Sequence, residues 1–130
     1  METEVKVYYE DTDCGGVVYY ANYLRYFERG RTEHLESQGI SLPEYQKRGV
    51  VFTVVNASIE YKSPAVYGDI LSVATSIEKI RGASFVVKYG IKRKSDGKLL
   101  ITGSTRMACV DSSMKPIMIP DEIREALERG

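Results

Sequence analysis

The sequence is poor in the residues from which many enzyme sites are built. Its 130 residues include one histidine, two cysteines and no tryptophan, and 18 lysines and arginines balance 18 aspartates and glutamates. A single histidine excludes multi-histidine metal sites, and two cysteines are too few for a disulfide scaffold. The zero formal net charge gives no electrostatic basis for binding nucleic acid or an anionic membrane. We therefore expect neither as a partner.

Long apolar runs are also missing. No stretch approaches the roughly 20 apolar residues that span a bilayer, and the first residues, Met-Glu-Thr-Glu-Val-Lys, lack the basic and apolar regions of a secretory signal. Because Cys14 and Cys109 fit reduced thiols, we expect a cytoplasmic protein. The length and the 43% of hydrophobic residues suit one domain, residues 1–130, with one ordinary core.

One amphipathic helix is predicted from Ala21 to Gln38, with Gly39 as its stop signal. Mostly apolar and aromatic residues recur at helical spacing, namely Tyr20, Leu24, Phe27 and Leu35 with Arg31 between them, and Ala21 and Tyr23 widen the stripe. A helix that is apolar over so much of its circumference needs other elements wrapped around it.

The rest of the chain is predicted to form long strands and a short final helix. The strand candidates are Glu4–Tyr9, Val50–Lys62, Asp69–Ile80, a run from Ser84 to Lys92, and Leu99–Val110, and the helix is Asp121–Arg129. In the fourth strand the apolar residues alternate with mostly polar ones. One long helix and long antiparallel strands predict an α+β architecture in which a curved sheet wraps the helix. The lack of regular strand–helix alternation argues against a doubly wound fold.

The segment before the predicted helix, residues 10–16, gathers acidic groups and glycines. A helix N-terminus exposes unpaired amides and a partial positive charge, which can hold a developing oxyanion. A carboxylate just upstream could then activate water, or attack, at the same carbon. From the residues alone two interpretations stay open: an acyl-transfer site, or a capping loop with solvated acids.

The chain resembles the hotdog-fold acyl-CoA thioesterases, specifically the YbgC-type branch of the 4-hydroxybenzoyl-CoA thioesterase family. The resemblance covers nearly the whole chain, in order. Its residues are Val7-Tyr8-Tyr9-Glu10-Asp11-Thr12-Asp13, Gly15-Gly16-Val17-Val18-Tyr19, Ala21-Asn22-Tyr23, Phe27-Glu28-Arg29, Arg31-Thr32-Glu33, Ile59-Glu60-Tyr61, Pro64-Ala65, Asp69 and Arg81-Gly82-Ala83-Ser84-Phe85.

The resemblance implies a hotdog fold and hydrolysis of an acyl-CoA thioester to a carboxylic acid and free CoA, without metal or cofactor. It implies that Asp13 is the nucleophile or general base and that the backbone N–H of Tyr20, where relatives often carry histidine, polarises the carbonyl. The implied substrate-binding residues are Gly15, Gly16, Tyr19, Tyr23, Arg81 and Ser84, with Arg81 toward the CoA phosphates. Asp11 is expected to be structural.

The resemblance also implies a homodimer, and for YbgC-type proteins a tetramer of paired dimers, with sites between subunits. Alternatives remain open. A non-enzymatic acyl-CoA binding protein would bind without releasing thiol, and an acyl-carrier-protein thioesterase would differ only in the carrier. A hotdog dehydratase or hydratase usually needs a histidine with an acid, and the only histidine, His34, falls inside the predicted helix.

Overall fold

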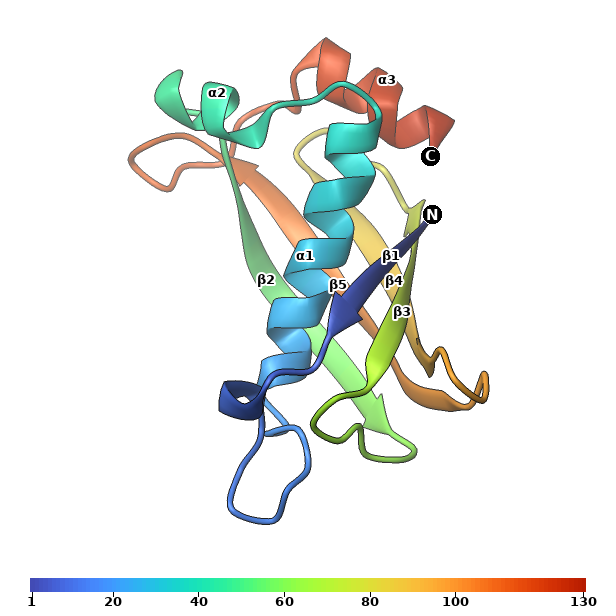
Figure 1. Ribbon diagram of the computed structural model, residues 1–130. Helices are drawn as coiled ribbons and strands as arrows, with labels where there is room; N and C mark the ends of the chain where they lie inside the picture. The colour runs from blue at the N-terminus through green and yellow to red at the C-terminus, as the bar shows by residue number, and fades with distance from the viewer.

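A five-stranded sheet and one long helix dominate the computed structural model, which describes residues 1–130 (Figure 1). The long helix is α1 (Asn22–Ser37), and a 3₁₀ turn covers Tyr9–Asp11. The remaining elements are β1 (Glu2–Lys6), α2 (Leu42–Lys47), β2 (Val51–Tyr61), β3 (Ile70–Glu78), β4 (Ser84–Arg93), β5 (Leu99–Val110) and α3 (Asp121–Arg129).

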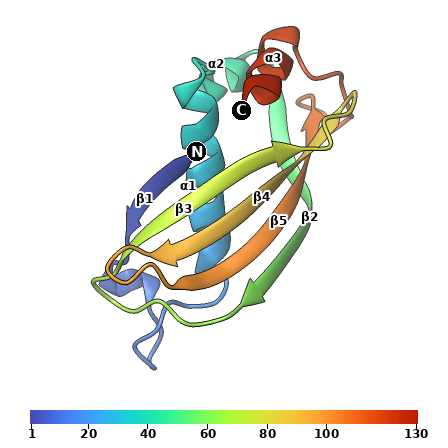
Figure 2. The same cartoon turned by 90° about the vertical axis from the view of Figure 1, so that its right-hand side faces the viewer.

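The strands lie in the order β1-β3-β4-β5-β2, and every neighbouring pair is antiparallel. Figure 2 shows the curved sheet from the side opposite α1, which lies across its other face. This arrangement confirms the predicted α+β hotdog architecture. Because the order is not sequential, β2 lies at one edge of the sheet, although it precedes β3 in the sequence.

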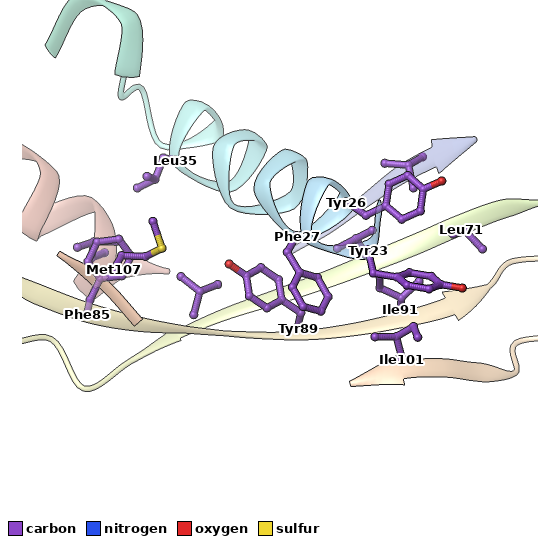
Figure 3. Close-up of a cluster of buried hydrophobic side chains, with 14 of the residues drawn as sticks. Tyr23, Tyr26, Phe27, Leu35, Leu71, Phe85, Tyr89, Ile91, Ile101 and Met107 are labelled. Carbon is purple, nitrogen blue, oxygen red and sulfur yellow. The ribbon is translucent and has the colours of Figure 1, made fainter. Parts of the chain in front are cut away.

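The core fills the space between α1 and the sheet (Figure 3). The predicted alternation in β4 is confirmed, because Phe85, Val87, Tyr89 and Ile91 are all buried. The ring of Phe27 on α1 stacks on Tyr89, with ring centroids 4.0 Å apart and planes 5° apart. The helix and sheet are therefore joined by aromatic packing at their centre.

The buried face of α1 differs from the predicted stripe. Tyr20 and Leu24 are 62% and 40% exposed, whereas Tyr26 and His34 are buried. Gly30 explains why a different face of α1 is buried. A Cβ there would lie 2.9 Å from Val73 Cγ1, so β3 packs directly against the helix backbone. The prediction relied on large apolar residues. It therefore missed the face of α1 that carries Gly30, where the lack of a side chain permits the closest approach to the sheet.

Two local predictions were also wrong. The first strand covers Glu2–Lys6 rather than Glu4–Tyr9, because the Asp11 carboxylate accepts the Tyr8 N–H at 2.9 Å and the chain curls into the 3₁₀ turn. The short helix α2 was not predicted. β5 has its predicted bounds, and the remaining strands differ from theirs by a residue or two.

The two ends of the subunit carry different features. The loop of residues 10–20 lies at the N-terminal end of α1, at the bottom of Figure 1, whereas α2, α3 and the turn between β3 and β4 lie at the opposite end. Cys14 is exposed, Cys109 is buried, and the two are not joined. None of the helices has the length and apolarity to cross a membrane.

Candidate active site

Asp13 lies in a tight turn that its own hydrogen bonds close. Its N–H donates to the Val17 carbonyl at 2.9 Å, and its carbonyl accepts the Gly16 N–H at 3.1 Å. Its side-chain Oδ1 accepts the Gly15 N–H at 2.8 Å. The residue is exposed. The turn therefore fixes one carboxylate oxygen and leaves the other free to act on a ligand.

Both glycines of the motif have a structural reason to be glycine. Gly16 adopts φ +81°, a conformation that other residues rarely take. A Cβ on Gly15 would lie 3.2 Å from Asp13 Oδ1, closer than comfortable packing allows. Their place in the Asp13 turn agrees with the motif, and direct contact with substrate remains a prediction.

Asp11 anchors the loop, as expected for a structural residue. It is 5% exposed, and its Oδ2 accepts the Tyr8 N–H. Its backbone carbonyl accepts the Tyr19 N–H at 2.9 Å. The segment that enters the loop is thereby tied to the segment that leaves it, which holds the turn of Asp13 against the start of α1.

The tip of α1 presents unpaired amides. The helix begins at Asn22 with Ala21 as its N-cap, so Tyr20 lies just outside it. The N–H groups of Tyr20 and Ala21 donate no hydrogen bond within the chain, whereas the Asn22 N–H donates to the Tyr19 carbonyl at 2.8 Å. Free amides at a helix N-terminus favour negative charge on a ligand.

A hollow of about 330 Å³ joins the Asp13 turn to the tip of α1. It is lined by Glu10, Asp11, Thr12, Asp13, Tyr19, Ala21, Asn22 and Arg25. Asn22 and Arg25 were missed as site residues by sequence reasoning. The available signal was their spacing of three, which places both on one face of the helix.

The tyrosines around the loop face different spaces. Tyr19 lines the hollow of Asp13, and its ring lies 4.6 Å from that of Tyr20. The Tyr20 side chain instead borders a neighbouring hollow of about 230 Å³ with Tyr23, Tyr61 and Pro64. The Tyr61 hydroxyl donates to the Tyr20 carbonyl at 3.2 Å, which orients the peptide before the helix.

Tyr23 belongs mainly to the core. It is 2% exposed, and its hydroxyl accepts the Ala65 N–H at 3.1 Å. Burial raises the pKa of this phenol. The structure therefore gives Tyr23 a packing role and does not bring it to the hollow that holds Asp13.

Arg81 and Ser84 lie at the other end of the subunit. Ser84 is the first residue of β4 and pairs with Ala108, which in turn pairs with Thr53 near the start of β2. The 16 residues of α1 extend about 24 Å from the Asp13 end toward this end. The side chain of Arg81 is exposed. One chain alone does not bring these two residues to Asp13.

No group of three or more histidine, cysteine or acidic side chains is arranged to hold a metal ion. His34 is buried at the far half of α1, where its Nδ1 lies 2.8 Å from the Thr75 hydroxyl. Neither the only histidine nor a metal cluster therefore faces the hollow. The residues that line it supply carboxylates, the hydroxyls of Thr12 and Tyr19, the backbone amide of Ala21, one side-chain amide and one guanidinium.

Comparison with known proteins gives a consistent set of relatives. The model of the thioesterase-like superfamily matches residues 7–127. The acyl-CoA thioesterase YbgC of Haemophilus influenzae is 37% identical over 94% of this chain and 90% of its own length. The acyl-CoA thioester hydrolase YbgC of Escherichia coli is 40% identical over 92% of this chain and 89% of its own.

Solved structures of similar fold are also thioesterases. The DHNA-CoA thioesterase of Staphylococcus aureus superposes with a TM-score of 0.93 at 31% identity, covering 98% of this chain and 88% of the other. A 1,4-dihydroxy-2-naphthoyl-CoA thioesterase from Synechocystis gives a TM-score of 0.90 at 28% identity, covering 97% and 93%.

Proposed function

Because the chain belongs to the thioesterase-like superfamily and is a thioester hydrolase, we propose that it hydrolyses acyl-CoA at the hollow between Asp13 and the tip of α1. One observation carries this assignment. The carboxylate of Asp13 and the free backbone amide of Ala21 line the same hollow, and the free amide of Tyr20 is the preceding one in the chain. Hydrolysis of a thioester needs these two kinds of group on either side of the carbonyl carbon.

The proposed roles follow from charge. Asp13 acts as nucleophile or general base at the carbonyl carbon, and the N–H of Tyr20 donates to the carbonyl oxygen as it becomes negative. Removing one such donor typically costs about 2.7–4 kcal/mol of transition-state stabilisation, so backbone amides suffice for a large effect. Since the Tyr20 contribution is a backbone group, the tyrosine in place of the histidine of many relatives is compatible with the reaction.

The second half of the site is proposed to come from a partner subunit. The exposed edge of β2 suits antiparallel pairing with a second β2 across a two-fold axis. That pairing brings the start of one β2 beside the end of the other. Arg81 of the partner subunit and Ser84 of the partner subunit then approach the end that carries Asp13, where Arg81 reaches the CoA phosphates. We propose a homodimer of this kind, two of which form a tetramer in the cytoplasm.

A dehydratase is disfavoured by the position of His34, which is buried at the other half of the helix. A binding protein without activity remains an outcome of the test. The purified protein is incubated with acetyl-, butyryl-, benzoyl- and lauroyl-CoA, and free thiol is measured. We expect thiol release from at least one ester and a loss of about 100-fold in Asp13→Asn.

The matched control is Asp121→Asn, the same chemical change at the first residue of α3, which should keep full activity. Asp13→Asn with less than a tenfold loss would reject the role of Asp13. Saturable CoA binding with no thiol release from any ester would instead support a binding protein. Parallel assays with acyl-carrier-protein thioesters identify the preferred carrier.

A further inference from the structure

Two buried polar groups beside the hollow have no hydrogen-bond partner. Asn22 is 6% exposed, yet its amide nitrogen Nδ2 is unpaired. The hydroxyl of Tyr26, one helical turn further along α1 and 0% exposed, is also unpaired. A buried polar group without a partner costs about 1–3 kcal/mol, so two of them on one helix, one of which lines the candidate site, call for a functional explanation.

The surroundings of Tyr26 define how the Asn22 amide is oriented. The Asp11 carboxylate and the Asn22 amide lie near this phenol; burial, and then the neighbouring Asp11, raise its pKa. Neither group lies in hydrogen-bonding geometry with the Tyr26 hydroxyl, and the Asn22 nitrogen is buried beside this phenol rather than at the hollow. The nitrogen is thus turned inward, and Oδ1 is the polar end of Asn22 toward the hollow that it lines.

We propose that Asn22 Oδ1 accepts a hydrogen bond from the water that hydrolyses the thioester, which makes Asn22 a further catalytic residue. This inference rests on the proposed function. A water with one proton toward Asp13 and the other toward Asn22 has its remaining lone pair free for the carbonyl carbon. Tyr26, buried beside the inward-facing amide nitrogen, is a positioning residue that acts through Asn22.

The general-base step balances without any co-reactant. The water oxygen forms a bond to the carbonyl carbon, its proton passes to Asp13, and the π electron pair moves onto the oxygen beside the Tyr20 N–H. When the carbonyl re-forms, the carbon–sulfur bond breaks and its electron pair leaves with the CoA thiolate, which takes the proton from Asp13. Asn22 keeps the second water proton hydrogen-bonded throughout and is chemically unchanged.

Competition between water and hydroxylamine tests this role. Wild type and Asn22→Ala are given the fastest acyl-CoA of the panel with hydroxylamine, and acid and hydroxamate are quantified after subtracting the enzyme-free rate. We expect kcat for hydrolysis to fall about 100-fold with KM within about threefold. Hydroxylamine is a stronger nucleophile than water and depends less on a proton acceptor. The hydroxamate-to-acid ratio should therefore rise at least about tenfold in Asn22→Ala.

A second variant distinguishes an acceptor from a merely structural side chain. Asn22→Asp keeps oxygen acceptors toward the hollow and should hydrolyse at least about tenfold faster than Asn22→Ala. Cys14→Ser, in the exposed loop, is the control for local disturbance and should match wild type. If Asn22→Ala does not fold, Tyr26→Phe replaces it, with a rise of about threefold in the same ratio, because the Asn22 amide loses its polar neighbour.

An unchanged ratio in Asn22→Ala, or in Tyr26→Phe where it stands in, overturns the inference. The inference is also overturned if Asn22→Asp hydrolyses the ester no faster than Asn22→Ala. A wild type that releases no thiol from any acyl-CoA overturns the proposed function together with this inference. An active wild type with an unchanged ratio overturns the role of Asn22 alone, so the two failures are distinguishable.

Discussion

Gly103, in β5, lies where the ring of Phe27 packs against the sheet. A Cβ at this position would lie 2.7 Å from two ring atoms of Phe27 and 2.7 Å from the Ser58 carbonyl oxygen. Phe27 cannot move away freely, because it is fully buried and stacks on Tyr89. The absence of one side chain therefore sets how closely helix and sheet approach.

We expect Gly103→Ala to destabilise the protein by about 2 kcal/mol through overpacking, which corresponds to a fall of about 8 °C in melting temperature. Gly90→Ala in β4 is the matched control, because its added Cβ would meet only Leu99 Cδ1 at 4.0 Å. Thermal denaturation followed by circular dichroism measures both. Equal melting temperatures for the two variants would contradict the packing argument.

His34 is the residue whose ionisation should couple to folding. It is 2% exposed and bonds to Thr75, and burial, and then the nearby amino terminus, lower its pKa. The unfolded chain then binds a proton at a pH where the folded chain does not. The stabilisation is complete above the unfolded pKa of about 6.5 and is lost as the pH falls toward the lower folded value.

We therefore expect the wild-type melting temperature to fall between about pH 7.5 and pH 5.5 more steeply than that of His34→Asn, which has no group to protonate there. Asparagine also offers a polar atom near the place of Nδ1, so Thr75 keeps a partner. Differential scanning fluorimetry across this range gives both slopes. Parallel slopes would show that other groups account for the pH dependence.

At the scale of elements, β2 stands out because both faces of its centre are exposed, from Val54 to Ser58. An edge strand with unpaired backbone groups and exposed valines invites pairing with another strand. The groove between β2 and α1, of about 450 Å³, is lined by Leu24 and Val54 together with charged residues of the helix. A second copy of the chain would cover this groove and this edge together.

This pairing predicts the effect of a charge on β2. Val54→Asp should leave a monomer nearly unaffected, since Val54 is 43% exposed in the single chain. In a dimer the aspartate is buried without a partner, so we expect the assembly to dissociate. Ile70→Asp is the control, because Ile70 is 42% exposed and lies away from β2. Light scattering after size-exclusion chromatography distinguishes the two outcomes, and an intact Val54→Asp oligomer would argue against the β2 interface.

The sequence predicted those elements whose pattern is local. The alternation in β4 and the position of α1 follow from side-chain periodicity; the alternation was confirmed, and α1 is one residue shorter at each end than the predicted Ala21–Gln38. The buried face of α1 was not predictable in this way, because it depends on how Gly30 meets Val73 on a distant strand. Helix α2 was predictable but missed: Ser41, Pro43 and Glu44 form a start signal that the structure uses, with the Ser41 hydroxyl accepting the Glu44 N–H at 3.4 Å.

The candidate site was likewise predictable only where its residues are neighbours in the sequence. The Asp13 turn and the adjoining helix tip are contiguous in sequence, so the motif located them together. Asn22 was overlooked, because its significance comes from a missing hydrogen-bond partner and from Tyr26 and Asp11 around it. Burial and hydrogen bonding of this kind arise only once the loop is folded against the helix.

At the scale of the whole molecule, the proposed site is divided between the two ends of the subunit. Asp13 lies at one end of α1, and Arg81 lies beyond the other. If both serve one acyl-CoA, they must come from different subunits. A two-fold dimer then holds two equivalent sites, each combining Asp13 of one chain with Arg81 of the other.

Mixed dimers test this division directly. Arg81→Glu alone should raise KM for acyl-CoA strongly, because it repels the CoA phosphates, and Asp13→Asn alone should be nearly inactive. A mixed dimer of the two variants has one site with both changes and one site with neither. Refolding equal amounts together makes about half the dimers mixed, so about a quarter of the wild-type activity should return at low substrate. If Asp13 and Arg81 serve the same site within one chain, every site in the mixture keeps one defect, and no activity beyond that of the separate variants appears.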